Sequence, residues 1–304
     1  MADQAKPAHK AGYIAIVGEP NVGKSTLLNT LLGQKISIVT PKPQTTRQRV
    51  LGILTQEGAQ MIFLDTPGFL KPKYLLHREM VKNAEAALKD AEIILVLTEV
   101  AKKTELPAEV SERLSGLWGR KPIFLIINKS DTINKLELLP LIKHFSTEYK
   151  FTEIIPVSAL KNDNVAEIVH AVIRHLPEHE PFYPDDIVSE YPERFFAAEF
   201  IREKLFEQFR EEIPYSTAVE IAEFKDRDNG KTLIRAEIIV ERESQKGIVI
   251  GRKGEALKEI GKTARLEIEQ FLQHPVFLEL HVKVREKWRE NESMLRQLGY
   301  HSKE

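Results

Sequence analysis

The chain has 304 residues, of which 42% are hydrophobic and 29% are charged, with a formal net charge of −1 and no cysteine. The missing cysteine excludes disulfides, thiol catalysis and thiolate metal sites, and the near-zero charge confines any nucleic-acid surface to a local patch. No apolar run reaches the ~18 residues of a membrane span, and residues 1–10 contain no apolar signal core. We therefore expect a cytoplasmic protein, and its length favours two domains.

Up to about Leu176, short apolar runs alternate with stretches of helical spacing. The apolar runs predict buried strands at Tyr13–Val17, Met61–Leu64, Ile93–Leu97, Ile123–Ile127 and Ile154–Val157. The other stretches predict helices at Lys24–Leu32, Val81–Lys89, Glu109–Trp118, Glu137–Tyr149 and Val165–His175, and Arg49–Gln56 predicts an antiparallel edge strand. This alternation is typical of an α/β fold, a mostly parallel six-stranded sheet with helices on both faces and sites at the carboxyl ends of its strands.

A stretch with four prolines then interrupts regular structure, which predicts a linker at 179–194 between a domain at 11–178 and a smaller α+β domain at 195–304. Residues 1–10 are expected to form a disordered tail. The elements predicted for the smaller domain are helix Phe195–Arg210, strands Thr217–Phe224 and Thr232–Glu241 joined by a turn at 228–230, a short helix from Ser244, a long helix to about Gln273, strand Val276–Arg285 and a helix from Trp288.

Four short motifs follow predicted strands of the first domain, and the first of them, GEPNVGKS, begins at Gly18. Gly18 and Gly23 would let the backbone wrap around phosphates, so that amide N–H groups at the start of a helix point at the β-phosphate. Lys24 would meet the β- and γ-phosphate oxygens, and the Ser25 hydroxyl would coordinate Mg²⁺. This motif predicts a P-loop, although by itself it also occurs in unrelated loops.

The second motif, DTPG, places Asp65 at the end of an apolar strand, where an unpaired carboxylate would be costly. We expect Asp65 to contact Mg²⁺ through water and the Gly68 N–H to reach the γ-phosphate. A loop rich in proline and threonine precedes it, and a threonine there could bind Mg²⁺ only when the γ-phosphate is present. We favour Thr46 for this role over Thr45.

The third and fourth motifs, NKSD and SAL, predict base recognition. The Asp131 carboxylate can accept hydrogen bonds from N1–H and the exocyclic amine of guanine, whereas adenine offers neither donor. Asn128 should brace the pocket, and Lys129 should lie along the base or ribose. The Ala159 N–H should donate to guanine O6, with Ser158 shaping the turn. All four motifs in this order predict a GTPase.

The predicted nucleotide-binding residues are Gly18, Glu19, Pro20, Asn21, Val22, Gly23, Lys24, Ser25, Thr26, Asp65, Gly68, Asn128, Lys129, Asp131, Ser158, Ala159 and Leu160. The predicted catalytic residues are Lys24, Thr46 and Gly68, and the predicted Mg²⁺ site consists of Ser25, Thr46 and Asp65.

Phe69 directly follows DTPG, at a position where many GTPases carry a glutamine that orients water. An apolar ring cannot orient water, so we expect slow intrinsic hydrolysis and a missing contribution from a partner, a cation or another loop residue. Arg47 and Arg49 are internal candidates, although a solvated surface explains them equally well.

In the second domain, GIVIGRKGEALKEIG places a G-x-x-G turn between two helices. The glycines would let backbone amides approach a sugar-phosphate chain, as in a KH module that grips about four nucleotides of single strand. The predicted RNA-binding residues are Lys246, Gly247, Ile250, Gly251, Arg252, Lys253, Gly254, Lys258 and Lys262. An apolar groove for bases is expected from Ile248, Val249, Ile250, Leu257 and Ile260. Four basic residues around Trp288 either extend the basic surface or form an ordinary exposed helix start; they are Lys283, Arg285, Lys287 and Arg289.

With PQTTR, HVKVREKW and a terminal LGY added to these motifs, residues 10–301 resemble the Era family of bacterial GTPases. The resemblance implies a P-loop GTPase domain followed by a type II KH domain that binds the 3′ end of 16S ribosomal RNA during assembly of the 30S subunit. It also implies that GTP favours RNA binding, that RNA stimulates hydrolysis, and that the protein associates loosely with the inner membrane. Asn21 matches a P-loop asparagine with which some relatives hold an activating K⁺. We expect a monomer.

Two other interpretations are open. The C-terminal domain could bind protein or the switch loops rather than RNA, as a regulatory module, or the chain could be a pseudo-GTPase scaffold. RNA binding and phosphate release distinguish these alternatives.

Overall fold

The structure is a computed structural model that describes residues 9–100, 105–227 and 230–300. The chain divides into two compact units. The first unit contains the residues up to Ser37, Thr46–Pro72 and Met80–Glu190, and the second contains Ile38–Thr45, Lys73–Glu79 and the chain from Tyr191 onward. Two residues of the predicted turn, 228–229, and the first eight of the predicted tail lie outside the described residues. In the described parts of the chain, every helix is too short or too polar to cross a membrane.

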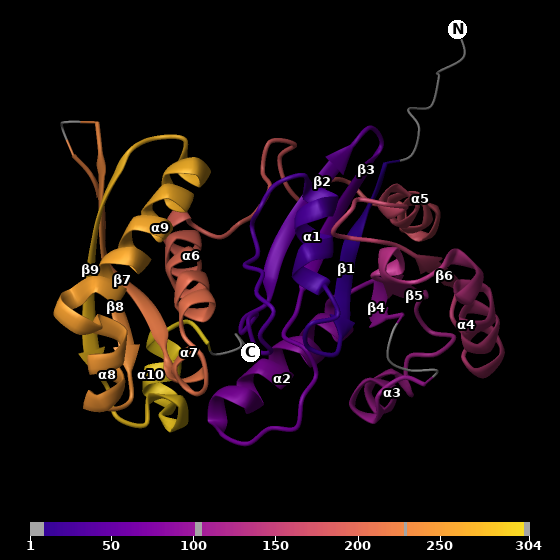
Figure 1. The fold of residues 1–304 in the computed structure, drawn as a ribbon. Helices are drawn as coiled ribbons and strands as arrows, with labels where there is room; N and C mark the ends of the chain where they lie inside the picture. The colour runs from indigo at the N-terminus through magenta and orange to yellow at the C-terminus, as the bar shows by residue number, and fades with distance from the viewer. Residues whose placement is uncertain (1–8, 101–104, 228–229, 301–304) are drawn as a thin grey trace, which may run out of the picture. The chain divides into compact units, whose positions relative to one another are not determined.

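The first unit contains the six-stranded sheet that the apolar runs predicted, in the order β2-β3-β1-β4-β5-β6 (Figure 1). Its strands are β1 (Lys10–Gly18), β2 (Val50–Gln56), β3 (Ala59–Asp65), β4 (Ile93–Glu99), β5 (Ile123–Asn128) and β6 (Glu153–Pro156). Only β2 runs antiparallel, at the edge, as expected. β1 begins three residues before the predicted Tyr13, because Lys10 pairs with Ala59 of β3.

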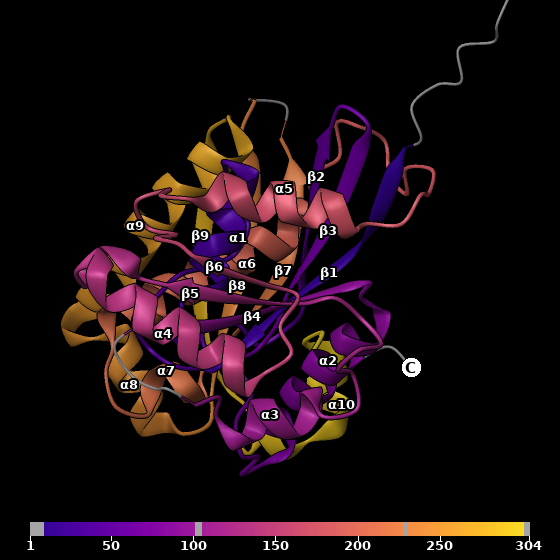
Figure 2. The same cartoon turned by 90° about the vertical axis from the view of Figure 1, so that its right-hand side faces the viewer.

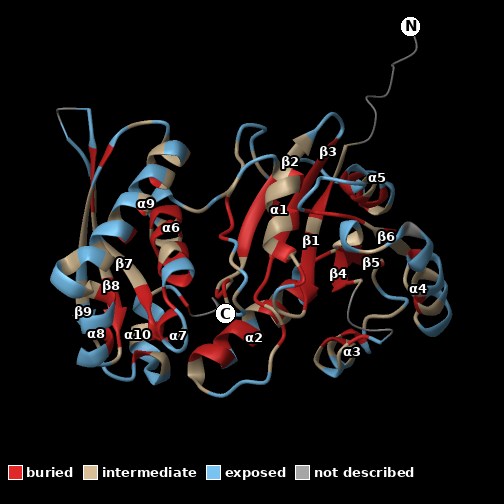
Figure 3. Ribbon diagram, in the orientation of Figure 1, coloured by how far each residue is buried: buried red, intermediate tan, exposed pale blue. Residues whose placement is uncertain are grey.

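Helices cover both faces of this sheet, with α1 and α5 on one face and α3 and α4 on the other (Figure 2). The helices that follow the strands are α1 (Lys24–Leu32), α2 (Leu75–Asp90), α3 (Ala108–Leu114), α4 (Lys135–Glu148) and α5 (Val165–His175), with a short 3-10 turn η1 (Ser130–Thr132) after β5. The central strands are buried (Figure 3). Burial on both faces explains why they read as unbroken apolar runs in the sequence.

The proline-rich stretch has no helix or long strand, but it is attached to the first unit up to Glu190. The Ile53 N–H of the edge strand donates to Val188 O at 2.7 Å, and the Ser189 hydroxyl donates to Leu51 O at 2.6 Å. The Gln60 side chain, which is fully buried, donates to Tyr183 O at 2.8 Å. The contacts to Ile53 and Leu51 supply partners to an edge strand that would otherwise expose these backbone groups.

The second unit contains a three-stranded sheet in the order β7-β8-β9, with α6 and α9 packed against it (Figure 1). Its elements in order are α6 (Glu193–Gln208), α7 (Ile213–Ser216), β7 (Ala218–Asp226), β8 (Thr232–Val240), α8 (Glu243–Ile250), η2 (Arg252–Gly254), α9 (Glu255–Leu272), β9 (Val276–Val284), η3 (Trp288–Glu290) and α10 (Glu292–Gln297). β7 and β8 are antiparallel, whereas β8 and β9 are parallel, so α8, the G-x-x-G loop and α9 form the crossover between them. This is the predicted type II KH topology.

The 3-10 helix η3 begins at Trp288, but this residue is not exposed, which corrects the prediction of an ordinary exposed helix start. The side chain is fully buried, and its Nε1–H donates to Ser216 O at 2.9 Å. The ring also stacks with Tyr300, their centroids 6.0 Å apart. Trp288 and Tyr300 are therefore part of the core of the second unit.

Candidate nucleotide and RNA sites

Two glycines shape the loop between β1 and α1. Gly18 has a φ of 148°, and a Cβ added there would lie 2.4 Å from Leu97 O. Gly23 has a φ of 99°, and an added Cβ would lie 2.2 Å from the Asn128 side-chain amide. Only glycine fits both positions, because a side chain would collide with β4 at one and with the NKSD loop at the other.

Lys24 turns back into this loop. Its ammonium group donates to Glu19 O at 2.8 Å and approaches Gly18 O at 3.4 Å. Burial lowers the pKa of Lys24 to about 8, against the opposing effect of the nearby Asp65 and Glu19 carboxylates. A phosphate group would supply the counter-charge that the buried ammonium lacks in these contacts.

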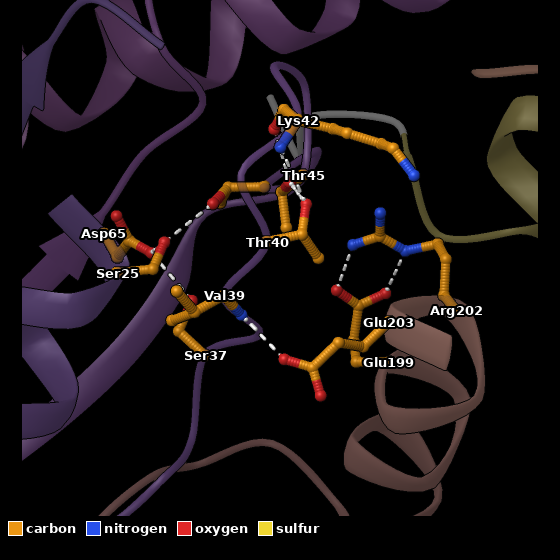
Figure 4. A network of polar contacts seen from close by, with 11 residues as sticks. Ser25, Ser37, Val39, Thr40, Lys42, Thr45, Asp65, Glu199, Arg202 and Glu203 are labelled. Atoms are coloured by element: carbon orange, nitrogen blue, oxygen red, sulfur yellow. Dashed lines mark hydrogen bonds and ion pairs between the residues drawn. The ribbon is translucent and has the colours of Figure 1, made fainter. Parts of the chain in front are cut away.

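Asp65 is fully buried at the end of β3 and collects hydroxyl groups around one oxygen (Figure 4). Its Oδ2 accepts from the Ser25 hydroxyl at 2.7 Å and from the Ser37 hydroxyl at 2.8 Å. Its Oδ1 is buried without a hydrogen-bond partner. Burial raises the pKa of Asp65, and the Ser25 hydrogen bond and the charge of Lys24 oppose that rise. A buried carboxylate oxygen without a partner, beside oxygen donors, fits a Mg²⁺ ion or its bound water.

Of the two threonines considered for the metal, Thr46 lies at this cluster. Its hydroxyl is 2.9 Å from the Ser25 hydroxyl. The Thr45 hydroxyl donates to Lys42 O at 2.7 Å and is 2.7 Å from the Thr40 hydroxyl, so its bonds lie within its own loop. Ser37 was missed in the sequence analysis, because it belongs to no motif and meets Asp65 only through the fold.

In the second unit, the segment 38–45 is held by α6 (Figure 4). The Val39 N–H donates to the Glu203 carboxylate at 2.8 Å, and that side chain is 1% exposed. Lys42 donates to Phe206 O and Phe209 O at the C-terminal end of the helix. A lysine is a suitable cap there, because the last carbonyl groups of a helix have no partners within it. The motifs gave no sign of these contacts, which join residues more than 160 positions apart.

Asn128 joins the P-loop to the SAL loop. Its side-chain N–H donates to Val22 O at 2.8 Å, and its Oδ1 accepts from the Ala159 N–H at 3.0 Å. The Ala159 N–H, which we expected to donate to guanine O6, therefore donates to Asn128 in this structure. Ser158 is fully buried, and its hydroxyl accepts from the Lys161 N–H at 3.2 Å, which is the turn-shaping contact that we expected.

The other residues expected around the base lie at the same end of the sheet. Lys129 donates to Asn21 O at 3.0 Å and pairs with Glu99, a partner that the sequence did not reveal. Asp131 is exposed in the first turn of η1, and Leu160 is 78% exposed. The carbonyl of Thr26, in the first turn of α1, accepts from Thr30 at 2.9 Å.

The DTPG loop rests directly on the P-loop. A Cβ added to Gly68 would lie 2.6 Å from Pro20 N, and the Phe69 N–H donates to Gly18 O at 3.2 Å. The Phe69 side chain turns inward and is 3% exposed. Neither proposed internal arginine is exposed and unpaired, since Arg49 pairs with Asp90 at 2.7 Å and Arg47 is 2% exposed.

The G-x-x-G loop is less enclosed by neighbouring segments than the P-loop is. Gly251 has a φ of 75°, and an added Cβ would lie 2.6 Å from the Ala256 Cβ, so this glycine allows α9 to start close to the loop. Gly254 has a φ of 81° with no atom within 4 Å of an added Cβ. Arg252 and Lys253 are exposed, and neither forms an ion pair with another residue that the structure describes.

The other residues predicted to bind RNA differ in their exposure. Lys258 and Lys262 are exposed along α9, Gly247 is exposed, and Lys246 approaches Glu243 at 3.9 Å. The predicted apolar groove requires a correction. Val249 and Ile260 are fully buried in the core of the unit and cannot line a groove.

Three members of that predicted groove are accessible. Ile248 is 50% exposed, and Ile250 and Leu257 are partly exposed. The difference follows from helical geometry, because residues one position apart on a helix point in different directions.

The basic residues at the end of β9 do not extend this surface. Lys283 pairs with Glu237, Arg285 pairs with Glu220 at 2.9 Å, and Arg289 pairs with Glu241. Lys283 and Lys287 are the exposed ones of the four. Three of the four basic side chains are thus neutralised within the unit.

Comparison with known proteins agrees with this geometry. Residues 13–129 match the family described as 50S ribosome-binding GTPase, and residues 212–289 match the KH domain family. The protein "GTPase Era" of Geotalea daltonii is 49% identical over 292 residues, which cover 95% of this chain and 97% of that protein.

Two solved structures match nearly the whole chain. One is Era in complex with MgGDPNP and nucleotides 1506–1542 of 16S ribosomal RNA, at 45% identity and a TM-score of 0.92, covering 97% of this chain and 100% of that one. The other is a tyrosine variant of Aquifex aeolicus Era bound to GDP·AlF4⁻, also at 45% identity and a TM-score of 0.92, covering 96% and 100%.

Proposed function

Because this chain belongs to the Era family of GTPases, we propose that it binds and hydrolyses GTP at residues 18–26, 65–68, 128–131 and 158–160 and binds the 3′ end of 16S ribosomal RNA during assembly of the 30S subunit. One observation carries the proposal. Four loops from the carboxyl ends of β1, β3, β5 and β6 meet around a backbone cradle, as a nucleotide site in a parallel sheet requires.

In the nucleotide site, Asp131 reads guanine while Asn128 ties the base-binding loops to the P-loop. The Ala159 N–H turns from Asn128 to guanine O6 when the base enters. The P-loop amides and Lys24 hold the phosphates, and the Gly68 N–H meets the γ-phosphate.

In this proposal Ser25, Thr46 and Asp65 would hold Mg²⁺, Asp65 through a bound water. The ion would neutralise charge on the β- and γ-phosphate oxygens. Hydrolysis is then attack of water on the γ-phosphorus with cleavage of its bond to the β-phosphate oxygen, which yields GDP and phosphate. Lys24 and the Gly68 N–H stabilise the charge that develops on these oxygens.

The inward position of Phe69 supports slow intrinsic hydrolysis, because the residue directly after Gly68 is an apolar ring that cannot orient water. In this proposal K⁺ would supply the missing contribution, and Asn21 would hold it. RNA would raise the rate further by ordering the switch segments.

In the second unit, Gly251, Arg252, Lys253 and Gly254 clamp the RNA backbone. The exposed lysines of α9 and Lys246 add charge, and Ile250 lies against a base. Residues 11–178 act as the GTPase domain, 179–194 as the linker and 195–304 as the RNA-binding domain. We further propose that the protein acts as a monomer in the cytoplasm and associates peripherally with the inner membrane.

The test is RNA binding by the full chain at several salt concentrations. With Arg252→Asp and Lys253→Asp combined, affinity for a single-stranded 16S 3′ end should fall, and the slope of log K against log salt should decrease by about 1.4, since each phosphate contact on a single strand contributes ~0.7. The control is Lys143→Asp combined with Lys150→Asp, which makes the same change in net charge on exposed residues of the first unit. If the loop variant keeps both affinity and slope, the RNA proposal is wrong.

One observation favours a second candidate, in which the C-terminal unit regulates the switch loops. The segment 38–45 belongs to the second unit and is bonded to Glu203 and to the end of α6. The same measurement separates the two functions, because a module that only held the switch loops would show no dependence of RNA affinity on Arg252 and Lys253.

A further inference from the structure

A cation lies over the buried ring that replaces the usual glutamine. The Arg113 guanidinium, from the end of α3, is 4.8 Å from the centroid of the Phe69 ring. The ring is almost completely buried, so water does not weaken the attraction between the cation and the face of the ring. No motif includes Arg113, so the sequence did not predict this contact.

Phe69 and its neighbour are in turn tied to the P-loop. The Phe69 N–H donates to Gly18 O at 3.2 Å, and the backbone of Gly68 lies so close to Pro20 that an added Cβ would be 2.6 Å from its nitrogen. One peptide unit separates the ring from the amide that should meet the γ-phosphate. A shift of the ring would therefore move that amide.

Arg113 is itself fixed from two sides. Its Nε donates to the Glu85 carboxylate of α2 at 3.0 Å, and its Nη1 donates to Glu109 O at 2.7 Å in its own helix. A guanidinium held by two hydrogen bonds and a ring cannot swing toward the phosphates as a catalytic arginine would. It can, however, keep Phe69 in one position.

We propose that Arg113 is a positioning residue for recognition of the third phosphate: it holds Phe69, and through it the Gly68 N–H, against the P-loop. α3 thereby contributes to the distinction between GTP and GDP although it touches no nucleotide. The inference rests on the role proposed above for Gly68. The competing interpretation is that Arg113 only joins α3 to α2 through Glu85, which would affect stability alone.

The test compares the affinities of the full chain for GppNHp and GDP with Mg²⁺ present. In Arg113→Met, which keeps the length of the side chain but removes its charge, affinity for GppNHp should fall by roughly two- to thirtyfold, the range of a buried cation–π contact, while GDP affinity stays within about twofold. Arg113→Lys should recover part of the loss. Arg120→Met, at an exposed arginine six residues after α3, is the control and should change neither affinity.

A double-mutant cycle with Phe69→Leu tests whether the effect of Arg113→Met comes from its contact with the Phe69 ring. Leucine keeps the apolar contact but has no aromatic face, so Arg113→Met should have little further effect in that background. Equal losses for both nucleotides, an unchanged ratio, or additive effects of the two substitutions would overturn the proposal. Gly68→Ala tests the role of Gly68 separately. If Gly68→Ala selectively lowers the affinity for GppNHp and Arg113→Met does not, only the Arg113 inference is wrong.

Discussion

Each unit of this protein begins a helix with a glycine-rich loop, and the two loops are built in opposite ways. In the loop of residues 18–25, both glycines are surrounded by other segments, and Lys24 is buried. In the loop of residues 251–254, one glycine faces open space, and the two basic side chains are exposed. In the proposed function both loops offer backbone amides to phosphate, so the difference lies in what surrounds them.

The enclosed loop suits a compact ligand, because β4 and the NKSD loop limit where a triphosphate can lie. The same enclosure buries the ammonium group of Lys24 and lowers its pKa to about 8. The open loop suits a polymer that must enter and leave from the side, and its charges keep their hydration until RNA arrives. Replacement of a glycine should therefore reduce ligand affinity more in the first loop than at Gly254 of the second.

The largest expected effect concerns the base in the enclosed site. Asp131→Asn should reverse the preference from GTP to XTP, because xanthine presents an acceptor where guanine carries its amine. A polar mismatch that the bound base would cover is worth roughly 10⁴ in discrimination. Competition between the two nucleotides for the protein measures it. Affinity for the 16S 3′ end serves as the control and should be unchanged. Retained preference for GTP would show that Asp131 does not read the base.

The comparison of the two loops is tested most directly by glycine replacement. Gly23→Ala should lower nucleotide affinity by about 100-fold, because the new Cβ strains the backbone and displaces the Asn128 side chain that holds Val22 and Ala159. RNA affinity should remain. Fluorescence titration with labelled GDP and with labelled RNA gives both values.

The corresponding glycine replacements in the loop of residues 251–254 should differ in their effect on RNA affinity. Gly251→Ala should reduce RNA affinity strongly, since its Cβ meets Ala256, whereas Gly254→Ala strains only a positive φ and should cost about tenfold or less. Equal losses at Gly251 and Gly254 would contradict the distinction between the two positions.

The smallest effect is the pH dependence of nucleotide binding. In the free protein the pKa of Lys24 is about 8, and bound phosphate raises it, so binding takes up a proton above that pH. Affinity for GDP should therefore fall by about fourfold between pH 7 and 8.5. Guanosine, which has no phosphate, is the control and should show no such change. Calorimetry in two buffers with different ionisation enthalpies would detect the proton taken up on binding. If no proton is taken up, Lys24 stays charged in the free protein as well.

The order of elements was predictable because it depends on local signals. Strands buried on both faces give apolar runs, and the β2 edge strand and the order of elements in the second unit followed from spacing and turn residues, whereas the type II KH fold was implied by the family resemblance. The ends of elements were less certain. α2 begins at Leu75 rather than Val81, and β1 begins at Lys10, because pairing with β3 extends the strand into a polar stretch.

Side-chain direction on the second unit was the weakest prediction. Five neighbouring apolar residues were assigned to one groove, but the helix turns Val249 and Ile260 into the core and leaves Ile248 outside. Trp288, flanked by basic residues, is also buried. Composition alone does not tell an apolar residue of the core from one at a surface, because both have the same chemistry.

By itself, the sequence determined the chemistry of the site: the glycines, the lysine, the carboxylates and their order along the chain, all of which depend on backbone conformation and residue type over a few positions. Only the tertiary structure decided the contacts that join distant segments. It placed Ser37 on Asp65, Glu99 on Lys129, and Arg113 over Phe69. Such contacts depend on the packing of whole elements, and no pattern of neighbours along the chain records which side chains that packing brings together.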